Sequence, residues 1–139
     1  MEIGRGEDRT TLLRVGVQDR WEKEWSLGKS WRLTGYWDFS AGIWDNAVES
    51  TADVGLTPVF RFERGRFYIE AAIGLHLVQA RISAGRTFST AVQFGDQIGA
   101  GFRSGRYDFG AHLQHLSNAG IDRPNPGINF LLVRLQYEL

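Results

Sequence analysis

The chain has 139 residues, with 16 basic and 16 acidic side chains that leave no formal net charge. This length predicts a single domain over residues 1–139, and the balanced charge argues against binding to nucleic acid or another polyanion. Cysteine is absent, which excludes disulfides, thiolate chemistry and cysteine-ligated metal. Abundant glycine and aromatic residues, with only 3 prolines, suit strands and tight turns better than helices.

Two segments that membrane and secreted proteins often carry are missing from the sequence. No apolar run approaches the roughly 18 residues that a membrane helix needs. The chain also begins at Met1 without the charged start, apolar run and small-residue cleavage site of a secretion signal. We therefore expect that a signal was removed or that the upstream part of the gene is missing.

Apolar and polar residues alternate along most of the chain, whereas helical spacing does not recur. The first such segment places Val15 and Val17 on one face, and Arg14 and Gln18 on the other. Six further segments repeat this pattern. In chain order, the seven predicted strands span residues 13–21, 32–43, 54–62, 68–77, 93–103, 106–117 and 131–138.

The two faces of these strands carry different side chains. Alternation alone would also fit a soluble sandwich or a lipocalin-like barrel. One face collects glycines and the charged or titratable residues Arg14, Arg32, Asp38, Arg61, Glu70, His76, Arg103, Asp108, Arg134 and Glu138. The other face carries the aromatic residues Trp37, Phe39, Phe60, Phe62, Phe94, Phe102, Tyr107 and Phe109. A small barrel has room inside for little more than ordinary side chains. The composition therefore favours an internal ion-pair network and a lipid-facing aromatic band.

Other polar and aromatic residues fit the same scheme. His76 and His112 have the inward parity and lack matched His, Asp or Glu spacing, so we expect them to join the internal network. The sequence predicts neither a metal nor a cofactor. Tryptophans near strand ends are expected to be interfacial anchors, namely Trp21, Trp25, Trp31 and Trp44.

The connections between the predicted strands alternate in length. Short turns occur at residues 27–30, 63–66 and 104–105, and longer links at residues 45–50, 80–90 and 118–126. This alternation is typical of outer-membrane barrels, which have short periplasmic turns, longer extracellular loops and an even number of strands. An eighth strand should precede Thr10, where Met1–Glu7 offers only a stub. The sequence thus predicts an all-β, eight-stranded antiparallel up-and-down transmembrane β-barrel with a truncated N-terminal strand.

A polar constellation near the C-terminus lies on the apolar side of this barrel. His115 and Ser117 share the outward parity, on a strand that should run toward the extracellular rim. Their backbones are about 6.6 Å apart along the strand, a gap that the two side chains can close with a hydrogen bond. Asn129 has the same parity and is expected roughly opposite Ser117, across the loop that follows.

These residue types suit ester hydrolysis. A serine hydroxyl is a poor nucleophile unless a neighbouring base takes its proton, and His115 is placed to do so. The oxyanion formed during ester cleavage needs fixed donors. The side-chain amide of Asn118 and the backbone amides of Ala119 and Gly120 are candidates for that oxyanion hole.

The segment His115-Leu116-Ser117-Asn118-Ala119-Gly120, followed by Pro124-Asn125-Pro126-Gly127-Ile128, resembles the signature of the lipid A 3-O-deacylases of Gram-negative outer membranes, the PagL family. Weaker likeness extends over nearly the whole chain from Leu13. The resemblance implies an eight-stranded barrel whose exterior site hydrolyses the ester of the 3-hydroxyacyl chain at position 3 of lipid A. It also implies Ser117 as nucleophile, His115 as base and the turn over residues 118–120 as oxyanion hole.

One position departs from the family pattern. That pattern has Glu after Pro-Asn-x-Gly-Ile, where this chain has Asn129. An amide can orient His115 through its oxygen but brings no negative charge, and an Asn in place of the acid of a serine triad slows turnover by roughly 10⁴. Asn129 is the favoured third member. Asp96, which also faces outward and should lie near Leu113 and diagonal to His115, remains a substitute, and loss of activity a third outcome.

The hypothesis of a lipid-facing esterase predicts lipid A or lipopolysaccharide as substrate, in contact with outer-membrane lipids. One alternative is a non-enzymatic outer-membrane barrel that acts in adhesion or envelope stability. Another is a soluble barrel that holds a lipophilic ligand inside, with the two faces exchanged. The sequence leaves open the acyl-chain preference, whether the chain forms a homodimer, and whether the loops cover the site.

Overall fold

The computed structural model of this chain describes residues 1–46, 49–79, 82–83 and 86–139. The long strands are β2 (Thr11–Arg20), β4 (Trp31–Asp45), β5 (Ser50–Arg64), β6 (Phe67–Val78), β9 (Val92–Ser104), β10 (Tyr107–Ser117) and β11 (Ile128–Tyr137). The short elements are β1 (Glu2–Gly6), the 3-10 turn η1 (Glu7–Arg9), β3 (Trp25–Leu27), β7 (Ile82–Ser83) and β8 (Arg86–Thr87). Each of the seven predicted strands coincides with one long strand, so the alternation identified them correctly.

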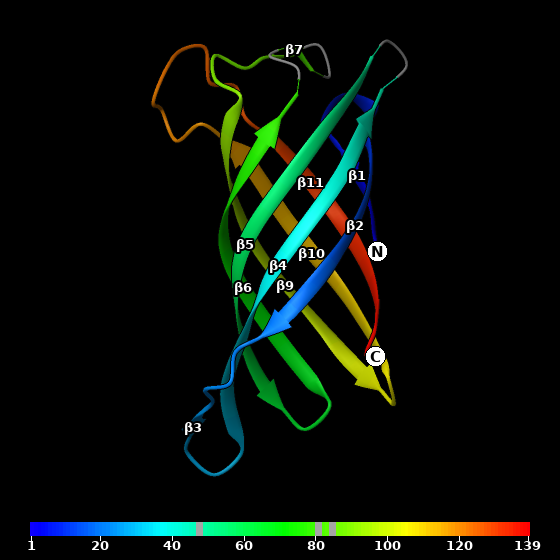
Figure 1. Cartoon of the computed structure of the whole chain (residues 1–139), viewed down its shortest axis with the longest axis vertical. Helices are drawn as coiled ribbons and strands as arrows, with labels where there is room; N and C mark the ends of the chain where they lie inside the picture. Colours follow the sequence, from blue (N-terminus) through cyan, green and yellow to red (C-terminus); the bar gives the residue numbers. More distant parts are fainter. Residues whose placement is uncertain (47–48, 80–81, 84–85) are drawn as a thin grey trace.

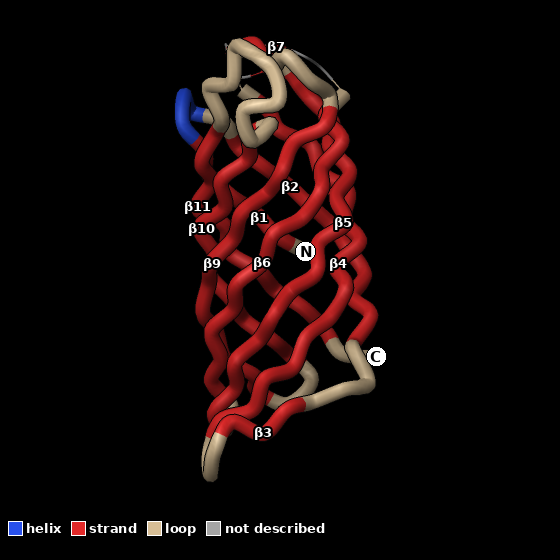
Figure 2. The backbone as a smooth tube through the Cα atoms, turned by 90° about the vertical axis from the view of Figure 1, so that its left-hand side faces the viewer, coloured by secondary structure: helices blue, strands red, loops and turns tan. Residues whose placement is uncertain are grey.

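The long strands and β1 close into an up-and-down antiparallel barrel (Figures 1 and 2). The order around the wall is β2, β1, β11, β10, β9, β6, β5 and β4, and β4 pairs back with β2. This is the eight-stranded all-β barrel that the sequence predicts. The short strand β3 extends the barrel by pairing with the first residues of β4.

The segment interpreted as a stub is the missing strand of the barrel. β1 pairs with β11 from Glu2↔Arg134 to Gly6↔Phe130, and on its other side with β2 from Glu2↔Arg14 to Arg5↔Thr11. Its few residues contact only part of each neighbour. η1 then turns the chain from β1 into β2, and this turn lies at the same end of the barrel as the loop after β10 (Figure 2).

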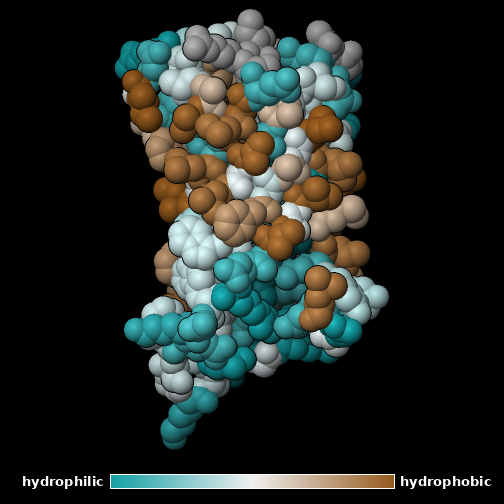
Figure 3. Space-filling model, viewed as in Figure 1, coloured by the Kyte–Doolittle hydropathy of each residue, from teal (hydrophilic) through white to brown (hydrophobic). Residues whose placement is uncertain are grey.

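The barrel presents its apolar face outward. Large outward side chains such as Phe39, Ile98 and Leu113 are 51%, 63% and 59% exposed. Hydrophobic residues form a band across the wall in Figure 3, between hydrophilic residues at the two ends. A soluble barrel with an apolar ligand cavity would have the opposite arrangement. Within the described residues, no helix is long and apolar enough to cross a bilayer.

The inward charges form the expected network. Glu70 accepts hydrogen bonds from Tyr36 at 2.8 Å, His112 at 2.8 Å and Arg134 at 2.9 Å. Asp53 pairs with Arg14 at 3.0 Å and with His76 at 3.1 Å. Both histidines are thus network members, as their parity predicts. Two residues assigned to this face lie at the end of the barrel instead, with side chains more than half exposed, Arg32 and Glu138.

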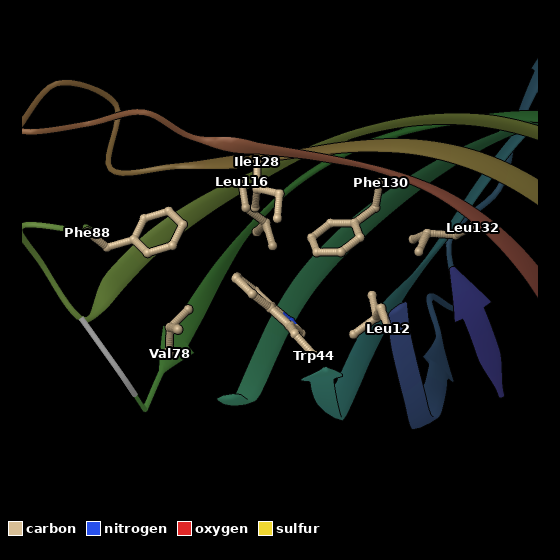
Figure 4. Packing of buried hydrophobic residues seen from close by; sticks show 8 residues of the cluster. All are labelled: Leu12, Trp44, Val78, Phe88, Leu116, Ile128, Phe130 and Leu132. Atoms are coloured by element: carbon tan, nitrogen blue, oxygen red, sulfur yellow. The ribbon is translucent and has the colours of Figure 1, made fainter. Parts of the chain in front are cut away.

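Apolar side chains, which the sequence did not predict, close the lumen at the end of the barrel that carries η1 and the loop after β10. This cluster consists of Leu12, Trp44, Val78, Phe88, Leu116, Ile128, Phe130 and Leu132 (Figure 4). The prediction that Trp44 anchors the barrel in the membrane interface is wrong, because Trp44 has inward parity and is 1% exposed. Its ring packs edge-on against Phe130 at 5.3 Å and Phe88 at 6.2 Å.

The two ends of the barrel differ in their connections, as predicted. Tight turns with glycine at positive φ join β5 to β6 at Gly65 and β9 to β10 at Gly105. The loop over residues 118–127 lies at the opposite end, together with the short strand β7 (Figure 1). By the rule for outer-membrane barrels, that end is extracellular. Parts of the predicted links at 45–50 and 80–90 lie outside the described residues.

Candidate active site

Three neighbouring strands place polar side chains in one row on the outer surface. His115 of β10 is the direct partner of Asn129 on β11 and of Asp96 on β9. The expected positions were two residues off, with Asn129 opposite Ser117 and Asp96 diagonal to His115. For Asn129 the difference arises because β10 and β11 stop pairing at Leu116↔Ile128, which makes the connecting loop longer than assumed. For Asp96 it arises because Tyr107 pairs with Ser104, so the turn between β9 and β10 is centred one residue later than predicted.

His115 is held by contacts on two sides of its ring. Its Nδ1 lies 2.8 Å from Oδ1 of Asn129. Its Cε1 and Nε2 lie over Gly127, where a Cβ atom would come within 2.6 and 3.1 Å of them. Gly127 has φ +62°, a conformation that side chains disfavour. The absence of a side chain at Gly127 therefore leaves the space that the imidazole occupies.

Ser117 follows two residues later at the end of β10, half-buried and opposite Phe94. Its Oγ lies 3.5 Å from the backbone nitrogen of Ala119. Both Ser117 and His115 belong to the described part of the chain, and no hydrogen bond joins them in this structure. Catalytic hydrogen bonds are often long before substrate binds. The pair shares one strand face, as predicted, with the hydrogen bond itself unformed.

The turn after Ser117 uses most of its donors to hold its own shape. The Asn118 side chain is 1% exposed, and its Nδ2 donates to Oγ of Ser89 at 2.7 Å and to the carbonyl of Asp122 at 2.9 Å. Its Oδ1 accepts from the backbone N–H of Gly120 at 2.9 Å. Two of the three expected oxyanion donors are thus engaged within the turn. The N–H of Ala119 is the one that points at Ser117.

Asn129 contacts a carboxylate that was not predicted from the sequence. Its Nδ2 donates to Oε1 of Glu7 at 3.0 Å, while its Oδ1 faces His115. Glu7 lies 122 positions away in the chain. The contact follows from the register of β1 with β11, which the sequence does not give: continuing the pair Gly6↔Phe130 by one residue brings Glu7 opposite Asn129. Interpreting residues 1–7 as an incomplete strand concealed it.

Asp96 is exposed on the other side of His115. Among the described residues, no hydrogen bond links its carboxylate to the imidazole. The Nδ1 atom of His115 is already taken by Asn129. The geometry therefore favours Asn129 over Asp96 as the group that orients His115.

An apolar row runs beside the polar one. Two residues further from the loop, Leu113 of β10 pairs with Ile98 of β9 and Leu131 of β11. These side chains line a groove on the barrel exterior together with His115 and Asn129. Such a groove can hold an acyl chain while its ester lies near the imidazole. Among the described residues, no group of three His, Asp or Glu side chains could hold a metal ion.

Comparison with known proteins identifies the family and supports the fold. Residues 11–138 match the family model "Lipid A 3-O-deacylase (PagL)". The chain is 34% identical over 123 residues to the lipid A deacylase PagL of Pseudomonas aeruginosa, with 83% of this chain and 70% of that protein covered. It is 42% identical over 85 residues to the lipid A deacylase PagL of Bordetella bronchiseptica, covering 58% of this chain and 47% of that protein.

A solved structure gives the same result. The crystal structure of the outer membrane enzyme PagL superimposes with a TM-score of 0.92 at 28% sequence identity, covering 99% of this chain and 97% of that one. The barrel, the apolar exterior and the polar row at its extracellular end are features that an enzyme acting on a membrane lipid requires. This chain therefore belongs to the lipid A 3-O-deacylase (PagL) family of outer-membrane enzymes.

Proposed function

We propose that this chain removes the ester-linked 3-hydroxyacyl chain at position 3 of lipid A by a serine esterase mechanism. Ser117 is the nucleophile, His115 the general base and Asn129 the group that orients the base. The observation that carries this proposal is the hydrogen bond between His115 and Asn129, formed on the lipid-facing wall two residues from Ser117. A barrel with a purely structural role has no need of this arrangement on its apolar face.

The reaction proceeds in two halves. In the first, Oγ of Ser117 attacks the ester carbonyl while Nε2 of His115 accepts the hydroxyl proton. The sugar oxygen leaves with that proton, and the acyl group stays on Ser117. In the second, His115 takes a proton from water, the hydroxide attacks the acyl-enzyme, and the 3-hydroxy fatty acid departs as Ser117 regains its proton.

The oxyanion that forms in each half needs a donor close to Ser117. The N–H of Ala119 lies on that side and is the donor that we assign. Asn118 and Gly120 contribute by holding the turn, through the hydrogen bonds that fix the Asn118 side chain. All of these residues come from one chain, so the mechanism does not require the homodimer that the sequence leaves open.

The substrate reaches the site from within the outer leaflet. The row of Ile98, Leu113 and Leu131 is apolar and exposed, and it continues directly from His115 toward the middle of the barrel. An acyl chain aligned with its neighbours in the bilayer can lie on this row without entering water. Lipid A itself is the expected partner, with the surrounding membrane lipids as its solvent.

Mass spectrometry of lipid A tests the proposal in cells that express the chain behind a secretion signal. The parent should shift lipid A by the loss of one 3-hydroxyacyl group, and Ser117→Ala should abolish that shift because it removes the nucleophile. Asp96→Asn should retain it if Asn129 orients the base. An unchanged acyl pattern with the folded parent would reject the function, and loss of activity in Asp96→Asn alone would transfer the orienting role to Asp96.

A further inference from the structure

We propose that Glu7 is a positioning residue for the deacylation reaction, acting through Asn129 on His115. The inference rests on the proposed function and concerns Asn129, the residue that departs from the family pattern. Asn129 Nδ2 donates to Glu7 Oε1 at 3.0 Å, and Asn129 Oδ1 lies 2.8 Å from His115 Nδ1. A hydrogen-bonded relay thus runs from Glu7 in η1 through Asn129 in β11 to His115 in β10.

An amide beside a catalytic histidine has a specific weakness. It can present either its oxygen or its NH₂ group to the imidazole, and a neutral imidazole carries its proton on either nitrogen. If NH₂ faces Nδ1, the imidazole proton sits on Nε2, which then cannot accept a proton from the serine. In a serine triad this wrong tautomer accounts for a loss of roughly 10⁴-fold.

Glu7 removes this ambiguity because an ionised carboxylate can only accept hydrogen bonds. The NH₂ group of Asn129 must face Glu7, since its oxygen would be repelled there. The oxygen of Asn129 then faces Nδ1 of His115, and Nδ1 carries the proton. Nε2 is left with a free lone pair, which is the state required of a general base. The Glu7 carboxylate also polarises the Asn129 amide, which strengthens the hydrogen bond between Asn129 and His115.

The fold holds Glu7 in place by backbone contacts. β1 pairs with β11 up to Gly6↔Phe130, so the next residue along β1 lies beside Asn129. The turn η1 is closed by hydrogen bonds from the Gly6 N–H to the Thr10 carbonyl at 2.8 Å and from the Thr10 N–H to the Glu7 carbonyl at 3.0 Å. The position of the carboxylate is therefore set by the barrel register rather than by a free chain end.

Glu7→Ala, Glu7→Gln and Asn129→Glu, made singly and in combination, test this role on purified protein with lipid A in detergent micelles. Glu7→Ala should lower kcat at least tenfold with little change in KM, because the amide of Asn129 loses its fixed orientation. Glu7→Gln can still accept a hydrogen bond through its amide oxygen, so its kcat should lie between that of the parent and that of Glu7→Ala. In the Asn129→Glu background, where a carboxylate meets His115 directly, Glu7→Ala should change kcat less than twofold.

A second measurement does not depend on turnover. With ¹⁵N-labelled histidine, the parent should show a protonated Nδ1 and an unprotonated Nε2 for His115, assigned with a His115→Asn variant. Glu7→Ala should convert this signal into a mixture of tautomers. Asp8→Asn is the matched control, because it removes the neighbouring carboxylate of the same turn. This variant should keep the kcat and the His115 spectrum of the parent.

The outcomes separate the two proposals. If Glu7→Ala leaves kcat within twofold of the parent, or lowers it equally in the Asn129→Glu background, the positioning role of Glu7 is wrong. An unchanged His115 tautomer in Glu7→Ala has the same meaning. If no variant hydrolyses lipid A, the proposed function fails, and the nitrogen spectra still decide whether Glu7 controls the tautomer of His115.

Discussion

Gly127 limits where the imidazole of His115 can lie. The ring of His115 occupies the volume that any side chain at position 127 would fill, with Cε1 only 2.6 Å from an ideal Cβ. On the other side, Asn129 holds Nδ1 at 2.8 Å. Gly127 thereby belongs to the proposed active site together with the polar residues.

Gly127→Ala should therefore lower kcat by about 100-fold, because a displacement of the base by about 1 Å is worth that much. The barrel should still fold, which heat-dependent electrophoretic mobility can show. Gly65→Ala is the matched control, since Gly65 has a similar φ of +61° in a turn at the far end but nothing within 4 Å of its Cβ position. Equal losses in both variants would mean that backbone strain, and not displacement of His115, is the cause.

At the level of the strands, buried charges inside the barrel connect one strand to another. Glu70 of β6 joins β4, β5, β10 and β11 through Tyr36, Arg61, His112 and Arg134. Its side chain is fully enclosed by these partners. Removing one member of a buried network leaves the others as uncompensated buried charges.

Glu70→Ala should destabilise the barrel by about 3–5 kcal/mol, the range for breaking a buried ion pair from one side. Urea unfolding in lipid vesicles measures this free energy. Glu138→Ala, which removes a carboxylate from the exposed pair with Arg20, should change it by less than about 0.5 kcal/mol. A loss below about 1 kcal/mol for Glu70→Ala would show that the network does not stabilise the strands.

Much of this element structure follows from the sequence because strand faces have a period of two. Parity correctly placed Glu70, His112 and Arg134 inside, and Phe39 and Leu113 outside. The same rule, applied to Trp44, would have placed it inside. Its position near a strand end suggested an interfacial anchor, and that inference from position alone was wrong.

The site was less accessible to sequence reasoning because it depends on register. The parity of His115, Ser117 and Asn129 is visible in the sequence, whereas the pairing of His115 with Asn129 depends on where the loop begins. The contact with Glu7 spans 122 positions and requires closure of the barrel by β1. The internal hydrogen bonds of Asn118 likewise involve Ser89, from a distant loop.

In the molecule as a whole, the packed cluster and the ion pairs lie inside the barrel, whereas the proposed site lies on its outer surface. The apolar cluster around Trp44 and Phe130 fills the lumen directly behind the active-site strands, because Leu116, Ile128 and Phe130 alternate with the outward residues (Figure 4). The wall beneath His115 and Ser117 is therefore backed by packed side chains. A rigid backing of this kind is what an esterase needs when its substrate lies in a fluid bilayer.

The proposed mechanism requires Ser117 to be an activated nucleophile on the lipid-facing wall. Reaction of the purified barrel with a hexadecylsulfonyl fluoride tests it most directly, because the alkyl chain can lie along the apolar row while the serine displaces fluoride. Peptide mass spectrometry should place the sulfonyl group on Ser117, in step with loss of lipid A hydrolysis, and Ser117→Ala should stay unlabelled. If the active protein stays unmodified at Ser117, or is modified at another residue, Ser117 is not the nucleophile.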